Sequence, residues 1–388
     1  MTPAIETLQQ QAEASFMPYG PPDGGVRLVE TFGAYEAEYA ALRKGVGLFV
    51  AAHKGVVELT GGDRRDFLHR MVTGDINRLK PGRGCRAFLL DTRGRIVADL
   101  TVLHEAERTL LEVDVFQTAE VVKTLDNYLF SEDVVLSDGR GGFTKITLHG
   151  PASAKLLEAL GEGSPVGLQP YQHCGIELGG TDGVVYRRDE TGSLGLHILI
   201  RSDTADALYA RLADAVGGLA PDTEPGEDGR GGAKRDIPGR GVGWLAYNTA
   251  RIEAQTALFH IDFGRDSLPH ETGDRVLGEA VSFTKGCYLG QEIVARMQSL
   301  GHPKKLLVGL KLDDDRMPVS GVPVFDLEAE STEIGAVTSS TISPLLGGKA
   351  IALAMMKWGR HHDGTKVRVP AEGQRVEAMV TTKPVVGG

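Results

Sequence analysis

Cysteine is scarce in this chain of 388 residues, which has three: Cys85, Cys174 and Cys287. The three lie far apart in the sequence, their number is odd, and no Cys-x-x-Cys pair occurs. These features exclude a disulfide framework and a cysteine metal site that is complete within one chain. They fit a reducing compartment, so we expect a cytoplasmic protein.

Long apolar runs and a basic surplus are also lacking. No window holds the ~18 apolar residues that a membrane helix needs, and residues 1–13 lack the basic-then-apolar pattern of a signal peptide. The formal net charge is −10, whereas non-specific binding of nucleic acid requires a basic surface. No Gly-x-Gly-x-x-Gly follows a predicted strand, so nothing indicates a Rossmann site. We expect a soluble protein with no membrane partner, for which nucleic acid is at most an indirect partner.

The composition is that of an ordinary globular protein, with 41% hydrophobic and 24% charged residues. At this length we expect two or three folded units. Residues 1–25 are interpreted as a loose N-terminal arm that ends in a turn-rich segment. Residues 26–303 alternate short strands and helices without a regular βαβ order, which predicts an α+β fold in two subdomains. Within them, residues 217–243 are rich in Gly, Pro, Asp and Arg and predict a flexible loop.

The last part of the chain, residues 304–388, has the pattern of a small β-barrel. Six short β-rich runs separated by turns are typical of such a barrel or of a sandwich. The runs are 307–312, 322–325, 334–339, 350–355, 366–369 and 376–381. We expect this unit to carry no chemistry of its own.

The segment Lys-Gly-Cys-Tyr-Leu-Gly-Gln-Glu at residues 285–292 is the most informative part of the sequence. It places Cys287 two residues after Lys285 and just before a helix predicted over 291–298. Side chains two apart in an extended chain point the same way, so we expect the ammonium beside the thiol. An ammonium and a helix N-terminus both favour a thiolate, which is the better nucleophile or metal ligand. The alternative is that Cys287 only packs, as most free cysteines do.

An acidic residue lies in a predicted hairpin formed by residues 85–90 and 95–103. The segment Gly-Arg-Ile-Val-Ala-Asp-Leu at residues 94–100 leads into the second strand and contains Asp99. A carboxylate at such a place can orient an amine or accept its proton. The alternative is a solvated strand residue that faces outward.

A second acidic residue lies in the segment Arg-Ile-Glu-Ala-Gln at residues 251–255. Glu253 is either a carboxylate that binds a ligand or one half of a surface ion pair with Arg251. A surface ion pair of this kind stabilises a protein by little. Farther along, residues 268–271 read Leu-Pro-His-Glu and end in Glu271.

These segments resemble the superfamily of the glycine-cleavage T-protein, an aminomethyltransferase, over roughly residues 27–388. T-proteins read Gly-Gly-x-x-Asp-Asp at the hairpin, where this chain has Ala98 for the first acid and keeps Asp99. They read Arg-Leu-Glu-Ala-Gly at the second segment, where this chain has Gln255 in place of the glycine. The octapeptide with its cysteine is similar to that of the YgfZ-type branch of the superfamily, because T-proteins have no cysteine there.

The resemblance implies a T-protein-like region that binds tetrahydrofolate or a one-carbon derivative of it, followed by a barrel. The T-protein glutamate matched by Glu253 binds the pterin ring, whose two adjacent N–H donors suit a carboxylate. Asp99 matches the acid placed beside the reacting nitrogen of the folate. The expected cofactor-binding residues are Glu253, Glu271, Asp99 and Arg251. The expected catalytic residues are Cys287, Asp99 and Lys285.

As a YgfZ-type protein, the chain would be an accessory protein for iron–sulfur cluster assembly or repair that supports tRNA-modifying iron–sulfur enzymes. Its partners would then be folate and iron–sulfur proteins or their assembly factors. The alternative is a folate-dependent aminomethyltransferase or a related demethylase, which Asp99 and Glu253 favour. A third interpretation is a scaffold that binds partners and no folate. If the chain is an enzyme, the resemblance implies one-carbon transfer.

Overall fold

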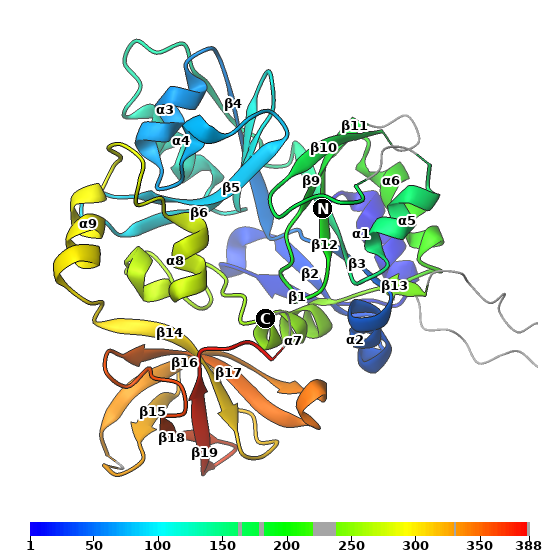
Figure 1. Cartoon of the computed structure of the whole chain (residues 1–388). Coiled ribbons are helices and arrows are strands. Elements are labelled where there is room, and N and C mark those ends of the chain that lie inside the picture. Colours follow the sequence, from blue (N-terminus) through cyan, green and yellow to red (C-terminus); the bar gives the residue numbers. More distant parts are fainter. Residues whose placement is uncertain (162–164, 178–181, 220–237, 330, 386–388) are drawn as a thin grey trace, which may run out of the picture.

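The computed structural model describes residues 1–161, 165–177, 182–219, 238–329 and 331–385. Figure 1 shows their helices and strands gathered into three lobes. Two lobes are built on sheets of five and six strands, and the third is a closed barrel. This architecture confirms the predicted α+β fold followed by a small β-barrel.

The first lobe is a five-stranded sheet in the order β5-β6-β7-β4-β8. Its elements are β4 (Lys54–Thr60), α3 (Arg64–Met71), η2 (Ile76–Arg78), β5 (Arg83–Leu90), β6 (Ile96–His104), β7 (Thr109–Asp114), α4 (Thr118–Asp126) and β8 (Val135–Asp138). The predicted hairpin is present, because β5 and β6 are antiparallel neighbours. Ala98 and Leu100 enter the apolar core beneath α3 and α4. Since side chains alternate along a strand, Asp99 points to the opposite face of the sheet.

The second lobe is a six-stranded sheet in the order β10-β11-β12-β9-β3-β13. Its elements are α1 (Pro3–Gln11), β3 (Val46–Val50), β9 (Phe143–His149), α5 (Ser153–Ala159), β10 (His173–Glu177), β11 (Asp182–Arg187), β12 (Gly195–Arg201), α6 (Ala205–Ala215) and β13 (Gly239–Gly241). One face packs its apolar side chains with those of α1, α5 and α6. Apolar residues of both lobes form a further cluster between the two sheets: Val56, Leu103, Leu110, Val184, Tyr186 and Leu199.

The segment 1–25 is folded, which corrects the expectation of a loose arm. Ile5 on α1 is fully buried in the core of the second lobe. Farther along, β1 (Ser15–Tyr19) pairs with β2 (Val26–Thr31) in an antiparallel ribbon, and η1 (Pro22–Gly24) forms the turn between them. α1 packs against α6, which follows some two hundred positions later in the sequence. The sequence of a polar segment alone does not indicate such a distant partner.

The predicted flexible loop 217–243 is corrected at its two ends. Leu219 is buried in the core of the second lobe. At the other end, β13 pairs in parallel with β3 at the edge of the six-stranded sheet. The middle of the predicted loop, residues 220–237, lies outside the described residues.

Two helices join the lobes below the sheets. α2 (Tyr35–Lys44) and α7 (Trp244–Glu253) pack against each other, and α7 also contacts the barrel. The chain then continues through η3 (Pro269–Thr272), α8 (Asp274–Ala280) and α9 (Gln291–Leu300). The predicted helix over 291–298 is therefore present as α9. In the described part of the chain, no helix is long and apolar enough to cross a membrane.

The third lobe is a closed barrel in the strand order β14-β17-β16-β15-β18-β19. Its elements are β14 (Lys305–Leu312), β15 (Pro323–Asp326), β16 (Glu333–Ser343), η4 (Pro344–Leu346), β17 (Lys349–Lys357), β18 (Lys366–Ala371) and β19 (Gln374–Thr381). All six strands predicted from the sequence are present. Ala350, Ala352 and Ala354 alternate along β17 into the barrel core, as the period of two in a strand requires.

Candidate functional site at the centre of the three lobes

Asp99 is held by a buried arginine. Arg86 on β5 donates to both carboxylate oxygens, with Nε 2.9 Å from Oδ1 and Nη2 2.6 Å from Oδ2. Burial raises the pKa of Asp99, but the guanidinium of Arg86 lowers it more, so the net pKa lies below its ordinary value. Asp99 is therefore an enclosed carboxylate, and the alternative of a solvated strand residue is wrong.

Arg86 also reaches an acid on α8. Its Nη1 lies 3.4 Å from Oε2 of Glu279, which accepts a second hydrogen bond from the hydroxyl of Tyr171 at 3.1 Å. The side chain of Glu279 is 35% exposed, against 11% for Asp99 and 2% for Arg86. The exposed fraction thus rises from Arg86 toward α8, which marks the side on which this centre meets the solvent.

The loop between β11 and β12 connects Asp99 to the other end of the centre. Arg188 donates to the hydroxyl of Thr101, two residues beyond Asp99, at 3.0 Å, and lies 3.3 Å from Oε1 of Glu190. The hydroxyl of Tyr247 on α7 donates to Oε2 of Glu190 at 2.9 Å. A continuous polar network therefore runs from β6 to α7.

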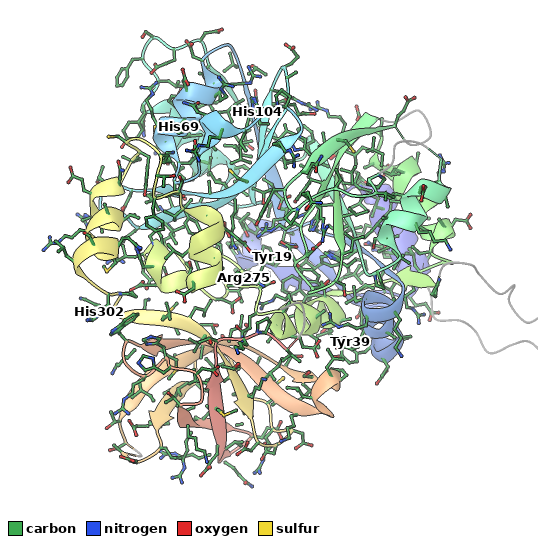
Figure 2. All side chains as sticks on the ribbon, in the orientation of Figure 1. Tyr19, Tyr39, His69, His104, Arg275 and His302 are labelled. Carbon is green, nitrogen blue, oxygen red and sulfur yellow. The ribbon has the colours of Figure 1, made fainter. Side chains whose placement is uncertain are left out.

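Glu253 lies at the end of α7 and is fully buried. Its Oε1 accepts from the hydroxyl of Ser343 in the barrel at 2.5 Å, and its Oε2 from the hydroxyl of Tyr39 on α2 at 2.7 Å. Arg43, also on α2, pairs with Oε2 and donates to the carbonyl of Thr191 at 2.6 Å. Both oxygens of Glu253 are thus occupied by donors from two other parts of the chain. Figure 2 labels Tyr39 next to the barrel.

Arg251 pairs with Asp262 and not with Glu253, so the alternative of an Arg251–Glu253 surface pair is wrong. Its Nη1 lies 2.5 Å from Oδ2 of Asp262, and both side chains are buried. The other oxygen of Asp262 accepts from the hydroxyls of Thr338 at 2.8 Å and Ser339 at 2.5 Å. In this structure Arg251 joins α7 to the barrel.

Glu271 closes a turn in the structure. Its Oε2 accepts the backbone N–H of Leu268 at 3.0 Å at the start of η3. Burial raises the pKa of Glu271 above its ordinary value.

A cavity of about 190 Å³ lies nearby, where α8 meets the barrel. Its lining includes Gln255, Arg275 and Leu307 but none of the predicted site residues. Figure 2 labels Arg275 near the centre.

Lys285 caps α3, contrary to the expectation that it lies beside Cys287. Its ammonium donates to the carbonyls of Val72 at 2.6 Å and Gly74 at 2.8 Å, and also to the carbonyl of His69. Burial lowers its pKa to about 8. Since cations are favoured at the carbonyl end of a helix, this contact is a structural anchor.

Cys287 is exposed, so the alternative of a packed core thiol is wrong. Residues 283–285 bend, and the chain is not extended before α9, so Lys285 turns inward while Cys287 faces out. Gly290 immediately precedes α9 and has a φ of +78°. Among the described residues, no hydrogen bond or ion pair joins Lys285 to Cys287. The thiol of Cys287 is accessible, but the ammonium of Lys285, which was predicted to lie beside it, binds backbone carbonyls at the end of α3.

Several arginines of the centre were missed by sequence reasoning, namely Arg43, Arg86 and Arg188. The hairpin register could have identified Arg86, because it lies opposite Thr101 and diagonally from Asp99. No comparable local signal places Arg43 or Arg188, since their partners come from distant parts of the chain.

Comparison with known proteins agrees with this three-lobed organisation. The model of the GCVT N-terminal domain matches residues 8–221, and that of the glycine cleavage T-protein C-terminal barrel domain matches residues 305–386. An aminomethyltransferase of Geobacillus sp. strain WCH70 is 30% identical over 364 residues, which cover 93% of each chain. That of Bacillus subtilis is 29% identical with the same coverage.

A solved structure shares the whole fold. The glycine cleavage system aminomethyltransferase T of Bartonella henselae matches with a TM-score of 0.81 at 23% identity, covering 100% of this chain and 98% of that one. At this identity the likeness concerns the fold alone. The family models, by contrast, span more than half of the chain and its barrel. The chain belongs to the glycine-cleavage T-protein (GCVT) family.

Proposed function

We propose that this protein is a folate-dependent one-carbon transferase of the aminomethyltransferase type. Tetrahydrofolate is the one-carbon carrier of the family. The observation that carries the proposal is the enclosed carboxylate of Asp99, whose pKa lies below its ordinary value despite burial because Arg86 holds it. An ionised carboxylate can accept the proton that an amine must lose when it receives a one-carbon unit.

The donor and acceptor groups at the centre suit a pterin. Both oxygens of Glu253 accept hydrogen bonds in the folded chain, and a pterin edge offers two N–H donors of the same kind. We propose that the ring takes the place of the hydroxyl donors Ser343 and Tyr39 at this carboxylate. Arg251 and Glu271 would then support the site through the barrel joint and η3.

In this proposal each residue of the chain has one task. Bound folate supplies the amine nitrogen that accepts the one-carbon unit. Arg86 keeps Asp99 ionised and oriented until the amine is present, and Oδ1 or Oδ2 of Asp99 then accepts the proton. Arg86 also contacts the carboxylate of Glu279. Because this second partner remains, the guanidinium of Arg86 loses less free energy when its contact with Asp99 weakens.

The test is transfer from an aminomethylated lipoyl carrier protein to tetrahydrofolate, measured as ammonia and methylene-folate product. Asp99→Asn should lower kcat about 10²- to 10⁴-fold, as loss of a proton acceptor does. The control is Asp266→Asn, because that side chain is 75% exposed. No transfer by the wild-type protein, or full transfer by a folded Asp99→Asn variant, contradicts the proposal.

The iron–sulfur role of the YgfZ-type proteins is a second candidate, favoured by one observation. Cys287 is exposed on a loop that Lys285 anchors to α3. A partner protein could therefore reach the thiol, and the loop that carries it is held in place. In this case Cys287→Ser should abolish support of iron–sulfur enzymes in cells, because a hydroxyl does not supply a thiolate at neutral pH. Full support by the serine variant would rule this role out for Cys287.

A further inference from the structure

A cluster of metal-ligating residue types lies beside the polar network, between α7 and the six-stranded sheet. His149 ends β9, His197 lies on β12, and Glu190 lies in the loop between β11 and β12. All three side chains are buried. One ligand atom from each lies within 4.8 Å of the other two.

Polar atoms without a hydrogen bond converge at this cluster. Among the described residues they include both ring nitrogens of His149, Nδ1 of His197 and Oε1 of Glu190. Buried polar atoms nearly always have partners, and leaving them without one is unfavourable. Oε1 of Glu190 still has the guanidinium of Arg188 at 3.3 Å, whereas the imidazole of His149 has no hydrogen-bond partner at either nitrogen. An ion at the cluster would take the lone pair of one of these nitrogens.

The surrounding groups orient the three side chains as outer contacts do at metal sites. Nε2 of His197 lies 2.8 Å from the carbonyl oxygen of Arg188 and 4.0 Å from Oε2 of Glu190, so the loop between β11 and β12 fixes the orientation of this ring. Tyr247 fixes the carboxylate of Glu190 through its hydrogen bond to Oε2. At Gly195 an added Cβ would lie 3.2 Å from Nδ1 of His149, so the glycine leaves room for the ring.

Three cations act on the charge of Glu190, namely Arg188, Lys145 and Lys54. Lys145 lies 2.9 Å from Glu112, and Arg188 lies 3.3 Å from Glu190 and is also close enough to Asp99 to interact with its charge. Glu112 neutralises Lys145, whereas Glu190 would serve both Arg188 and the ion. The ion would therefore be held by two neutral imidazoles and a carboxylate that also faces Arg188.

We propose that His149, His197 and Glu190 bind a divalent transition-metal ion of the zinc type. Two imidazoles and one glutamate are a ligand set that Zn²⁺ takes at three-residue sites, with water in the fourth position. Imidazole ligands also suit Co²⁺ and Ni²⁺. The ion would fix the loop from Arg188 to Thr191, which connects the contacts of Asp99 with those of Glu253.

The experiment is a titration of the metal-stripped full-length protein with Co²⁺, followed by visible absorption, and with Zn²⁺, followed by calorimetry. The wild-type protein should bind one equivalent of each, show the absorption bands of Co²⁺ with nitrogen and oxygen ligands, and melt at a higher temperature with Zn²⁺. His149→Gln and His197→Gln should each lose the absorption bands and bind Zn²⁺ more than about tenfold more weakly.

Two further variants make the result decisive. Tyr247→Phe keeps the ring and loses the hydrogen bond to Glu190, so it should weaken Zn²⁺ binding about 10- to 100-fold even if the histidine variants fail to fold. His104→Gln, which changes a buried histidine outside the cluster that hydrogen-bonds to Thr109 at 3.1 Å, should bind as the wild type does. No stoichiometric binding by the wild type, or unchanged binding by folded Tyr247→Phe, overturns the proposal.

Discussion

The charges buried at the centre are paired across elements. Arg86 pairs with Asp99 across the β5–β6 hairpin, and Lys145 on β9 pairs with Glu112 on β7 between the two sheets. Removing one partner of such a pair leaves the other charge buried and costs about 3–5 kcal/mol, whereas removing both together can be nearly neutral. The pairs therefore allow the structural role of each charge to be separated from its chemical role.

Asp99→Asn should lower the free energy of unfolding by about 3 kcal/mol, near the lower end of that range because Glu279 remains as a partner for Arg86. The double variant Asp99→Asn with Arg86→Gln should regain most of this loss, because neither charge is then left buried alone. Urea unfolding of the wild type, both single variants and the double variant measures the coupling. Strictly additive losses would contradict a direct Arg86–Asp99 interaction.

The same pair predicts a pH dependence. Burial and Arg86 together leave the pKa of Asp99 below its ordinary value of 3.8. The folded state then binds fewer protons than the unfolded state near pH 4, so the stability from Asp99 is present above that pH and is lost as the pH falls through the folded pKa. Unfolding free energies between pH 2 and 6 should fall less steeply for the Asp99→Asn, Arg86→Gln variant. If the unfolding free energy depended on pH with the same slope in the wild type and the double variant, the pKa of Asp99 would not be lowered in the folded protein.

At the scale of elements, the octapeptide 285–292 fixes α9 onto the β5–β6 hairpin. A Cβ added at Gly290 would lie 2.6 Å from the carbonyl oxygen of Asp91, and one added at Gly94 would lie 2.7 Å from Cβ of Ile293. Helix α9 was predictable because its start and its period are local signals. The bend that separates Lys285 from Cys287 was not, because it depends on the carbonyls of α3, about two hundred positions earlier.

Gly290→Ala should destabilise the protein by more than about 1 kcal/mol, because alanine is strained at positive φ and its Cβ would collide with the backbone of the hairpin turn. Gly286→Ala is the matched control, since its added Cβ meets nothing within 4 Å. Thermal unfolding of the two variants gives the comparison. Equal melting temperatures would mean that α9 does not rest on the hairpin as described.

At the scale of the whole molecule, the three lobes meet through α7. The six barrel strands were predictable from local alternation and turns, and Asp99 and Glu253 from their motifs. The partners of these acids were not, because Arg43, Tyr39 and Ser343 reach Glu253 from two other parts of the chain. Likewise the strand partner of β13 is β3, which lies far away in the sequence. Long-range pairing leaves no periodic signal in a sequence.

The joint between α7 and the barrel depends on Asp262. Asp262→Ala would leave Arg251 buried without its carboxylate and remove the acceptor of Thr338 and Ser339. The expected loss is about 3–5 kcal/mol of unfolding free energy, with faster proteolysis near residue 304, where the barrel begins. Glu292→Ala, at an exposed position of α9, is the control. Unaltered stability and proteolysis in Asp262→Ala would show that the barrel is joined by other contacts.

The central claim is that tetrahydrofolate binds at the centre where α2, α7 and the barrel meet, and calorimetric titration of the full-length protein tests it most directly. Glu253→Gln keeps the shape of the side chain and one of its two acceptor oxygens, but its NH2 group donates, so it cannot accept two pterin N–H donors as a carboxylate does. The account predicts saturable binding by the wild type, a loss of about ten- to a hundredfold in Glu253→Gln, and no change in Glu292→Gln on exposed α9. The absence of binding by the wild type, or equal affinity in a folded Glu253→Gln variant, would contradict it.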